Sequence, residues 1–210
     1  MTEHAQGLGR REQKKRETRR AIRDAALDLA LENGLENLTV EAIAQAAGVS
    51  PRTVFNYFDS KEDALVTQAA EGADEVCKLL LERPSQEPPL EAFRHAVIHS
   101  DYFGADPANR ERVLARQRLT QNHPSLMAHH LGKIAMVERM FADALAERLG
   151  LDAQDDIAPQ LLAAVAMSAI RVAVRQWVCK DELPLYDLFE TTFKQLEHLG
   201  LVTQHPQPAD

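Results

Sequence analysis

One group of side chains in this sequence has possible metal chemistry. Glu91, His95 and His99 repeat every four residues, so on a helix they would share one face. Two histidines at this spacing can hold a transition metal with the carboxylate nearby, which leaves a metal-responsive protein or a metal-dependent enzyme as alternatives. Histidines on a solvated helix face are more common, and no cysteine lies nearby as a further ligand. We therefore expect no metal and no other cofactor.

Other catalytic arrangements have no counterpart in the sequence. There is no nucleophile elbow, no phosphate-binding loop and no HExxH zinc motif. Cys77 and Cys179 are the only cysteines, and two distant thiols form neither a disulfide framework nor a zinc site. The sequence shows no charged surroundings that would activate either thiol for redox sensing. These observations predict that the protein is not an enzyme.

A second group of side chains can donate and accept hydrogen bonds from one short segment, residues 39–58. We expect Arg52, Thr53, Asn56 and Tyr57 to be exposed together on a short helix. Arginine matches the two acceptors of guanine, and asparagine matches the acceptor and donor of adenine, in the major groove of DNA. The group therefore favours recognition of double-stranded DNA.

Presenting these side chains requires a short helix, a tight turn and a second short helix. Thr39 can cap the first helix, and Ser50 followed by proline is a strong start for the second. Gly48 can adopt positive φ in the turn at little steric cost, and Ala44 is small where the helices must cross. Three apolar residues are expected to fill the space between the helices: Val49, Val54 and Phe55.

The distribution of charge supports contact with DNA, although the net charge is −8. Residues 10–23 hold eight Lys/Arg and two Glu, so the net charge of this stretch is +6 and that of the rest of the chain is −14. A local basic segment can contact phosphates while the acidic remainder of the protein repels them. A solvated helix face or a disordered arm would explain the same run less specifically.

The composition predicts an all-α fold. Ala, Leu, Glu, Gln and Arg are abundant and glycine and aromatic residues are sparse. Helical patterns are expected over about 10–33, 39–47, 51–58, 60–82, 90–103, 107–121, 124–149, 155–180 and 185–199, about nine helices in all. Because Arg171 and Arg175 interrupt the longest apolar stretch and no signal peptide opens the chain, we expect a cytoplasmic protein without a membrane span.

Residues 19–66 resemble the DNA-binding domain of the TetR (tetracycline repressor) family. The ending Tyr57-Phe-Asp-Ser-Lys-Glu62 is a specific part of the match. The other residues that carry the resemblance are Ile22, Ala25, Ala26, Leu29, Gly34, Thr39, Val40, Ile43, Ala44, Ala47, Gly48, Val49, Ser50, Thr53, Phe55 and Leu65. The resemblance implies a three-helix helix-turn-helix domain followed by a larger helical domain for effector binding and dimerisation.

The family resemblance also implies roles for individual residues. Arg52, Thr53 and Asn56 would face the major groove, while Thr39, Tyr57 and Lys61 would hold phosphates. Arg19, Arg20 and Ser50 would also contact the DNA. The basic run before Arg23 would reach an adjacent phosphate strand or the minor groove. The protein would be a homodimer that binds a pseudo-palindromic operator and is released from it by a small-molecule effector, which makes it a repressor.

Sites in the second domain follow from the resemblance and from apolar patterns. The effector pocket would be lined by Phe103, Met127, Met136, Met140, Phe141, Met167, Arg171 and Trp177. The dimer interface would use two helices, with Ala169, Ala173, Leu188, Thr192, Phe193 and Leu196. Methionine and aromatic residues at helical spacing are usually plain core, and both stripes could face the core of the monomer.

The predicted domain order is simple. Residues 1–9 form a flexible tail, 10–66 the DNA-binding domain with a fourth helix continuing to about 82, 67–202 the effector and dimerisation domain, and 203–210 a second flexible tail. A helical interaction module that does not bind DNA is the remaining alternative, but it leaves the polar face and the basic run unexplained.

Overall fold

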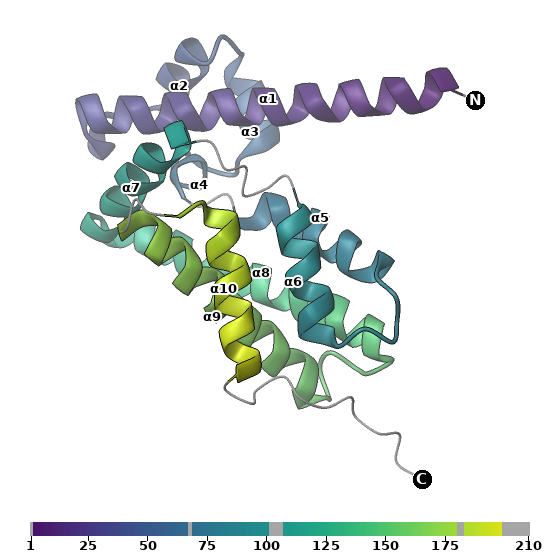
Figure 1. The fold of residues 1–210 in the computed structure, drawn as a ribbon. Helices are drawn as coiled ribbons and strands as arrows, with labels where there is room; N and C mark the ends of the chain where they lie inside the picture. Colours follow the sequence, from purple (N-terminus) through teal and green to yellow (C-terminus); the bar gives the residue numbers. More distant parts are fainter. Residues whose placement is uncertain (1, 67–68, 101–106, 180–182, 199–210) are drawn as a thin grey trace. The chain divides into compact units, whose positions relative to one another are not determined.

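A computed structural model describes residues 2–66, 69–100, 107–179 and 183–198, and within these ranges it is helical without a strand (Figure 1). This confirms the predicted all-α class. The described residues form ten α-helices and one 3₁₀ helix, η1: α1 (Thr2–Asn33), η1 (Leu35–Asn37), α2 (Val40–Ala46), α3 (Pro51–Tyr57), α4 (Lys61–Leu65), α5 (Ala69–Glu82), α6 (Pro89–His99), α7 (Pro107–Asn122), α8 (Pro124–Leu149), α9 (Ile157–Cys179) and α10 (Leu185–His198).

The chain divides into two compact units. The first contains residues 1–66 and 115–130, and the second contains 67–114 and 131–210. The sequence predicted one boundary after residue 66 and did not predict that residues 115–130 would join the first unit. They join it because Leu119 and Leu126 are buried in its apolar core, so that α7 and α8 each contribute residues to both units.

Two further boundaries differ from the expectation. Residues 2–9, predicted as a flexible tail, continue α1, since the stretch holds no proline to stop a helix. The predicted helix over 60–82 is interrupted, because α4 ends at Leu65 and the backbone of Val66 is extended. Ala64, Leu65 and Val66 are all buried in the core of the first unit. The predicted tail at 203–210 lies outside the described residues.

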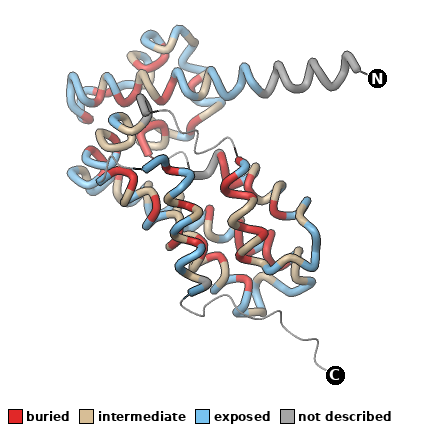
Figure 2. Tube along the Cα trace, viewed as in Figure 1, coloured by how far each residue is buried: buried red, intermediate tan, exposed pale blue. Residues whose placement is uncertain are grey.

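The core of the second unit contains aromatic rings that pack against one another. Phe93 of α6 meets Phe141 of α8 edge to face, with 4.8 Å between ring centroids, and lies 6.2 Å from the ring of Phe193 of α10. Figure 2 shows the buried positions running along the inward sides of these helices. Rings packed in this way contribute both buried apolar area and favourable quadrupole geometry. The aromatic residues of α6, α8 and α10 therefore form core in this unit.

Arginine side chains satisfy backbone carbonyls at helix ends of the second unit. Arg148 of α8 donates to the carbonyl oxygens of Arg83 and Glu87, at 3.0 and 2.9 Å, just beyond α5. Arg110 of α7 donates to the carbonyls of Trp177 and Val178 near the end of α9. The last carbonyls of a helix lack intrahelical partners, so such caps hold distant segments together.

Candidate nucleic-acid interface

The predicted helix-turn-helix is formed by α2, a turn and α3. Thr39 caps α2 by accepting a hydrogen bond from the Ala42 amide at 3.1 Å, and Ser50 caps α3 by accepting from the Thr53 amide at 3.1 Å. Gly48 has a φ of +67°, which confirms the left-handed turn. Ala44 is buried at the crossing of the helices. The local chemistry therefore determines this motif as the sequence predicted.

The start of α4 is capped by two side chains. The Ser60 hydroxyl accepts a hydrogen bond from the Asp63 amide at 3.1 Å. The Asp63 carboxylate accepts from the amide of Asp59 and so bonds one residue before the cap. Two otherwise unpartnered amides at the start of α4 are satisfied in this way. The α3–α4 connection is consequently well defined.

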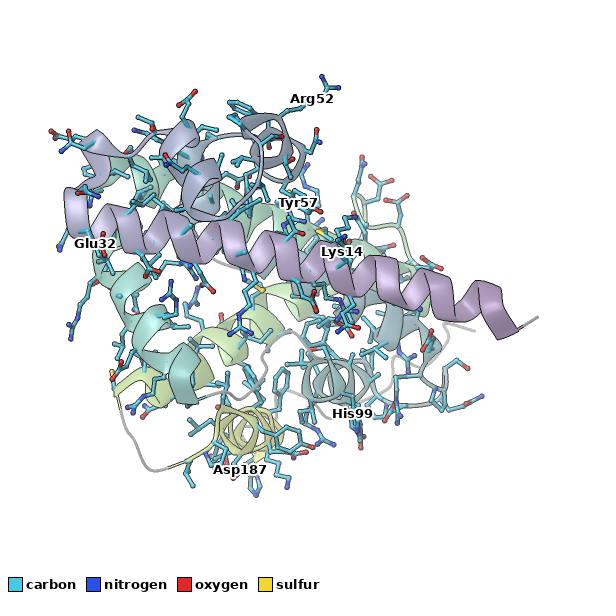
Figure 3. All side chains as sticks on the ribbon, turned by 90° about the horizontal axis from the view of Figure 1, so that it is seen from above. Lys14, Glu32, Arg52, Tyr57, His99 and Asp187 are labelled. Carbon is cyan, nitrogen blue, oxygen red and sulfur yellow. The ribbon has the colours of Figure 1, made fainter. Side chains whose placement is uncertain are left out.

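The exposed face of α3 holds Arg52, Phe55 and Asn56. Arg52 and Asn56 are exposed as expected, and Figure 3 shows Arg52 pointing away from the rest of the unit. Phe55 was predicted to fill the space between the helices, and this prediction is wrong, because its side chain is 57% exposed while Val54 is buried. The two residues are neighbours on the helix, and only one of them can face the core. The exposed face of α3 is therefore partly aromatic.

Hydroxyl groups line the start of each short helix. Thr39 and Ser50 are exposed, and Thr53 is half-buried with its hydroxyl 2.8 Å from that of Ser50. The Thr39 and Ser50 oxygens are used as caps, and one hydroxyl of the Ser50–Thr53 pair donates its hydrogen to the other. The Thr39 hydrogen and one hydrogen of this pair can still be donated to an anion. Tyr57 is half-buried and packs against the core of the first unit.

The Arg19 side chain contacts other residues of the first unit. Its Nη2 donates to the carbonyl oxygen of Tyr57 at 3.0 Å, and its guanidinium lies 5.2 Å from the centroid of the Phe58 ring. A carbonyl bond and a cation–π contact fix α1 against the end of α3. Arg19, predicted to contact DNA, is therefore engaged in contacts that hold α1 against the end of α3.

Lys61 is engaged in a similar way. Its ammonium donates to the carbonyls of Leu38 and Leu35, at 2.8 and 3.3 Å. These carbonyls lie in and just after η1, directly before the Thr39 cap. The side chain thus ties the start of α4 to the start of α2, a task that the sequence motif did not reveal. Any phosphate contact by Lys61 would compete with these two bonds.

The basic part of α1 is exposed. Lys14, Lys15 and Arg16 lie on the surface, and Arg20 is paired with Asp24 at 3.6 Å between the charged atoms. Among side chains described from residue 13 onward, the first buried one is Ile22. The cations therefore precede the part of α1 that packs into the first unit.

The structure rearranges the predicted metal group. Glu87, Glu91 and His95 place one ligand atom each within 4.8 Å of one another, whereas the Nδ1 atom of His99 bonds to the carbonyl of His95 at 2.8 Å. Glu87 also accepts two 2.7 Å hydrogen bonds from Arg83. The bonds from Arg83 lower the pKa of the Glu87 carboxyl. Since Glu87 is already held by arginine, this group is an ion-pair cluster and is assigned no metal function.

The predicted effector residues are not brought together as one set. Met127 belongs to the first unit, Phe141 packs edge to face against Phe93, and Met136 is 42% exposed. Arg171 is exposed and donates to the Ser168 hydroxyl at 3.0 Å. Met140 and Met167 pack against the core that contains Trp177, and Phe103 lies outside the described residues. Core packing explains most of this pattern.

The predicted dimer residues also need revision. Ala169, Ala173 and Phe193 are at most 3% exposed and belong to the core of the second unit. Leu188 and Leu196 are half-buried and pack against the same core, and the Thr192 hydroxyl bonds to the carbonyl of Leu188. Ala169, Ala173 and Phe193 therefore serve packing within one chain, whereas Leu188, Thr192 and Leu196 keep part of their surface accessible.

Another face of α9 is apolar and exposed. Ile157, Leu161 and Val172 are 71%, 60% and 36% exposed. Ala164 and Ser168 lie between them at helical spacing and are half-buried. By length and composition alone α9 could cross a membrane, but its opposite side forms the core of the second unit. We call these five residues the α9 face.

Comparison with known proteins gives the class. The family model described as bacterial regulatory proteins of the tetR family matches residues 22–66, and the model described as the MftR C-terminal domain matches residues 87–199. The transcriptional regulator TcmR of Streptomyces glaucescens is 35% identical over 201 residues, covering 90% of this chain and 87% of that protein. The chain therefore belongs to the TetR family and is a DNA-binding regulator of transcription.

Solved structures show the same fold at low identity. A TetR-family regulator from Syntrophomonas wolfei is similar with a TM-score of 0.57 and 15% identity, over 92% of this chain and 100% of that chain. The complex of SmeT with triclosan has a TM-score of 0.53 and 17% identity, over 92% and 97% of the two chains. SmeT is a repressor from Stenotrophomonas maltophilia. The helical architecture is thus that of the family along most of the chain.

Proposed function

We propose that this protein is a cytoplasmic, homodimeric repressor that reads a pseudo-palindromic operator and leaves it when a small molecule binds. The single observation that carries the proposal is the capped helix α3 with Arg52, Phe55 and Asn56 exposed together. Arg52 and Asn56 supply donors and acceptors for base edges, and Phe55 supplies apolar surface suited to a thymine methyl group.

The remaining groups of the first unit divide between contact and positioning. Thr39, Ser50 and Tyr57 contact phosphates, and Arg19 and Lys61 hold α1 and α4 in the register that makes these contacts possible. Phosphate contacts supply affinity that depends on salt, while the α3 face discriminates between bases. This division differs from a model in which every cation of the motif binds phosphate.

Dimerisation through the α9 face supplies the second recognition helix. Leu161 and Ile157 are exposed apolar residues on a helix whose other side is core, and small neighbours allow close helix approach. A two-fold interface would present two copies of α3 to two half-sites. The half-sites are then inverted repeats, which is why we propose a pseudo-palindromic operator.

Effector binding belongs to the second unit in this proposal. Triclosan in SmeT shows that the fold can hold a small molecule. A ligand that binds one spacing of the two recognition helices more tightly than the other shifts the population toward that state. Because the predicted effector residues do not form one set, the ligand is to be identified by screening small molecules against the purified protein.

The experiment is a fluorescence-anisotropy titration of purified protein with the DNA upstream of its own gene and a scrambled duplex. Both duplexes are measured at two salt concentrations. Tighter binding to the upstream DNA, weakening steeply as salt rises, supports sequence-specific regulation. Equal and weak binding to both duplexes, at both salt concentrations, contradicts a regulator that acts at its own promoter.

A further inference from the structure

The helix α1 presents one continuous face to solvent, on the side opposite its buried residues. Ala26, Leu27 and Ala30 are at most 2% exposed and belong to the core of the first unit. Six other positions recur at intervals of three and four residues, so they share the opposite side of the helix. These residues, which we call the α1 face, are exposed or half-buried: Lys14, Thr18, Ala21, Ala25, Asp28 and Glu32.

Charge reverses from one end of the α1 face to the other. Lys14 is an exposed cation at one end, and Glu32 is an exposed carboxylate at the other, roughly 27 Å away at about 1.5 Å per residue. Figure 3 shows Glu32 near the C-terminal end of α1 and Lys14 nearer to its N-terminus. No Lys or Arg occurs between Arg23 and Arg52, and the carboxylate of Glu36 in η1 is also exposed. One end of the face is thus complementary in charge to the other.

This arrangement makes the α1 face complementary to a second copy of itself. A two-fold axis between Ala21 and Ala25 would place two α1 helices antiparallel, with Ala21 of each copy opposite Ala25 of the other. Lys14 of each copy would then lie opposite Glu32 of the other, at both ends of the pair. The small alanines at the centre permit close approach of the two helices, and the spacing of three and four residues suits helices that cross at about 20°.

We propose that the α1 face binds the α1 face of a second copy of this chain, as an antiparallel helix pair with an ion pair at each end. This inference goes beyond the proposed function and does not depend on it, because the face does not include α3. Exposed ion pairs contribute little each and are screened by salt, so the contact is weak and forms at low salt. The contact proposed for the α9 face is apolar and persists at high salt. Together the two contacts link dimers into larger assemblies.

The test is sedimentation velocity of the full-length protein at concentrations up to about 0.1 mM, a range that detects weak association. It is run at low salt, where the Debye length is about 30 Å, and at high salt, where it is about 3 Å. Lys14→Glu and Glu32→Lys each reverse one end of the face. A third variant combines both changes in one chain, which restores opposite charges at both ends. Glu147→Lys changes an exposed carboxylate of α8 in the second unit and is the control matched in charge to Glu32→Lys.

The expected result is association that follows the pairing of charges. The parent and Glu147→Lys should form assemblies larger than a dimer at low salt and lose them at high salt. Each single reversal should raise the dissociation constant of these assemblies at least about tenfold, because two like-charged pairs replace two ion pairs. The combined variant should associate as the parent does.

Three outcomes would overturn the proposal. The first is a parent that forms nothing larger than a dimer at low salt. The second is a combined variant that associates no better than the single reversals, since restored complementarity would then have no effect. The third is an equal loss in Glu147→Lys and Glu32→Lys, which would trace association to net charge instead of to the α1 face.

Discussion

The two compact units expose opposite kinds of surface. The first unit shows solvent a polar and cationic face, with Arg52, Asn56 and Lys14 on it and Phe55 among them. The second unit exposes Ile157 and Leu161 on a helix that is otherwise core. A polar face suits a hydrated polyanion, and an apolar face suits a dry contact with protein. The comparison supports the proposal that the first unit binds DNA and the second unit binds a second copy of the chain.

The largest effect is expected from a charge placed on the α9 face. Leu161→Glu should convert the homodimer to a monomer, because a carboxylate would be buried without a partner. Losing the second recognition helix should weaken binding to the upstream DNA at least about 100-fold, or about 2.7 kcal/mol. Analytical ultracentrifugation and anisotropy measure the two effects. Leu81→Glu, at a 40% exposed leucine of α5, is the control and should remain dimeric.

A dimeric Leu161→Glu variant that binds DNA normally would contradict this assignment. The dimer interface would then lie elsewhere, and the exposed apolar residues of α9 would no longer be assigned to contact with a second copy of the chain.

A second large effect is expected inside the second unit. Arg148→Ala should lower the free energy of unfolding by about 2 kcal/mol, because half-buried carbonyls at and after the end of α5 would lose a charged donor. Urea unfolding measured by tryptophan fluorescence reports on this unit, which holds the single tryptophan, Trp177. The control Arg139→Ala removes an exposed arginine of the same helix. Equal stability of both variants would show that Arg148 does not hold the end of α5.

On the polar unit the effects should be selective for bases. Arg52→Ala and Asn56→Ala should each relax preference at particular positions by about 1–3 kcal/mol. Phe55→Ala should weaken discrimination of thymine from uracil, which lacks the methyl group. Binding to single-base variants of the upstream DNA measures all three. A uniform loss over every sequence would assign these side chains to the phosphate backbone.

A smaller effect distinguishes positioning from contact. Lys61→Gln should lower the stability of the first unit by about 1–2 kcal/mol, since the carbonyls of Leu35 and Leu38 lose a charged donor. Its affinity for DNA should fall across all sequences while the slope against salt stays unchanged. A slope reduced by about 0.9 would instead make Lys61 a direct phosphate ligand.

The smallest effect concerns the two thiols. Cys179 is exposed, whereas burial, with Asp74 and Asp143 nearby, raises the pKa of Cys77 to about 12. At pH 8 the Cys77 thiol therefore stays protonated and should react slowly with a disulfide reagent, while Cys179 reacts quickly. Counting released chromophore gives one fast thiol per folded chain and two after unfolding. Two fast thiols in the folded chain would refute the burial of Cys77.

Local sequence patterns predicted the helix-turn-helix well, because its caps and its turn are formed by residues close together in the sequence. The Thr39 and Ser50 caps and the Gly48 turn depend on residues within three positions of each other. Phe55 and Val54 show the limit of this reasoning, since adjacent apolar residues look alike in sequence. Which of them faces the core depends on how α3 packs.

Hydrogen bonds between residues far apart in the sequence could not be predicted from the sequence. Arg19 and Tyr57 are 38 residues apart, and Lys61 lies 23 residues from Leu38, so no spacing rule links them. Their cationic side chains look the same whether they bind phosphate or a carbonyl of the same chain. The same holds for Ala169 and Ala173, whose small size permits a dimer contact and a core contact equally.

The sequence by itself determined that the chain is helical, where the recognition helix begins and turns, and which family the chain belongs to. Helix formers, caps and a turn glycine act through neighbouring residues, so these features can be read from the chain in order. Tertiary structure alone decided that Ile157 and Leu161 are exposed and Ala173 is buried, and that residues 115–130 join the first unit. These outcomes depend on which surfaces of distant helices exclude water from each other, a property of packing that no local pattern contains.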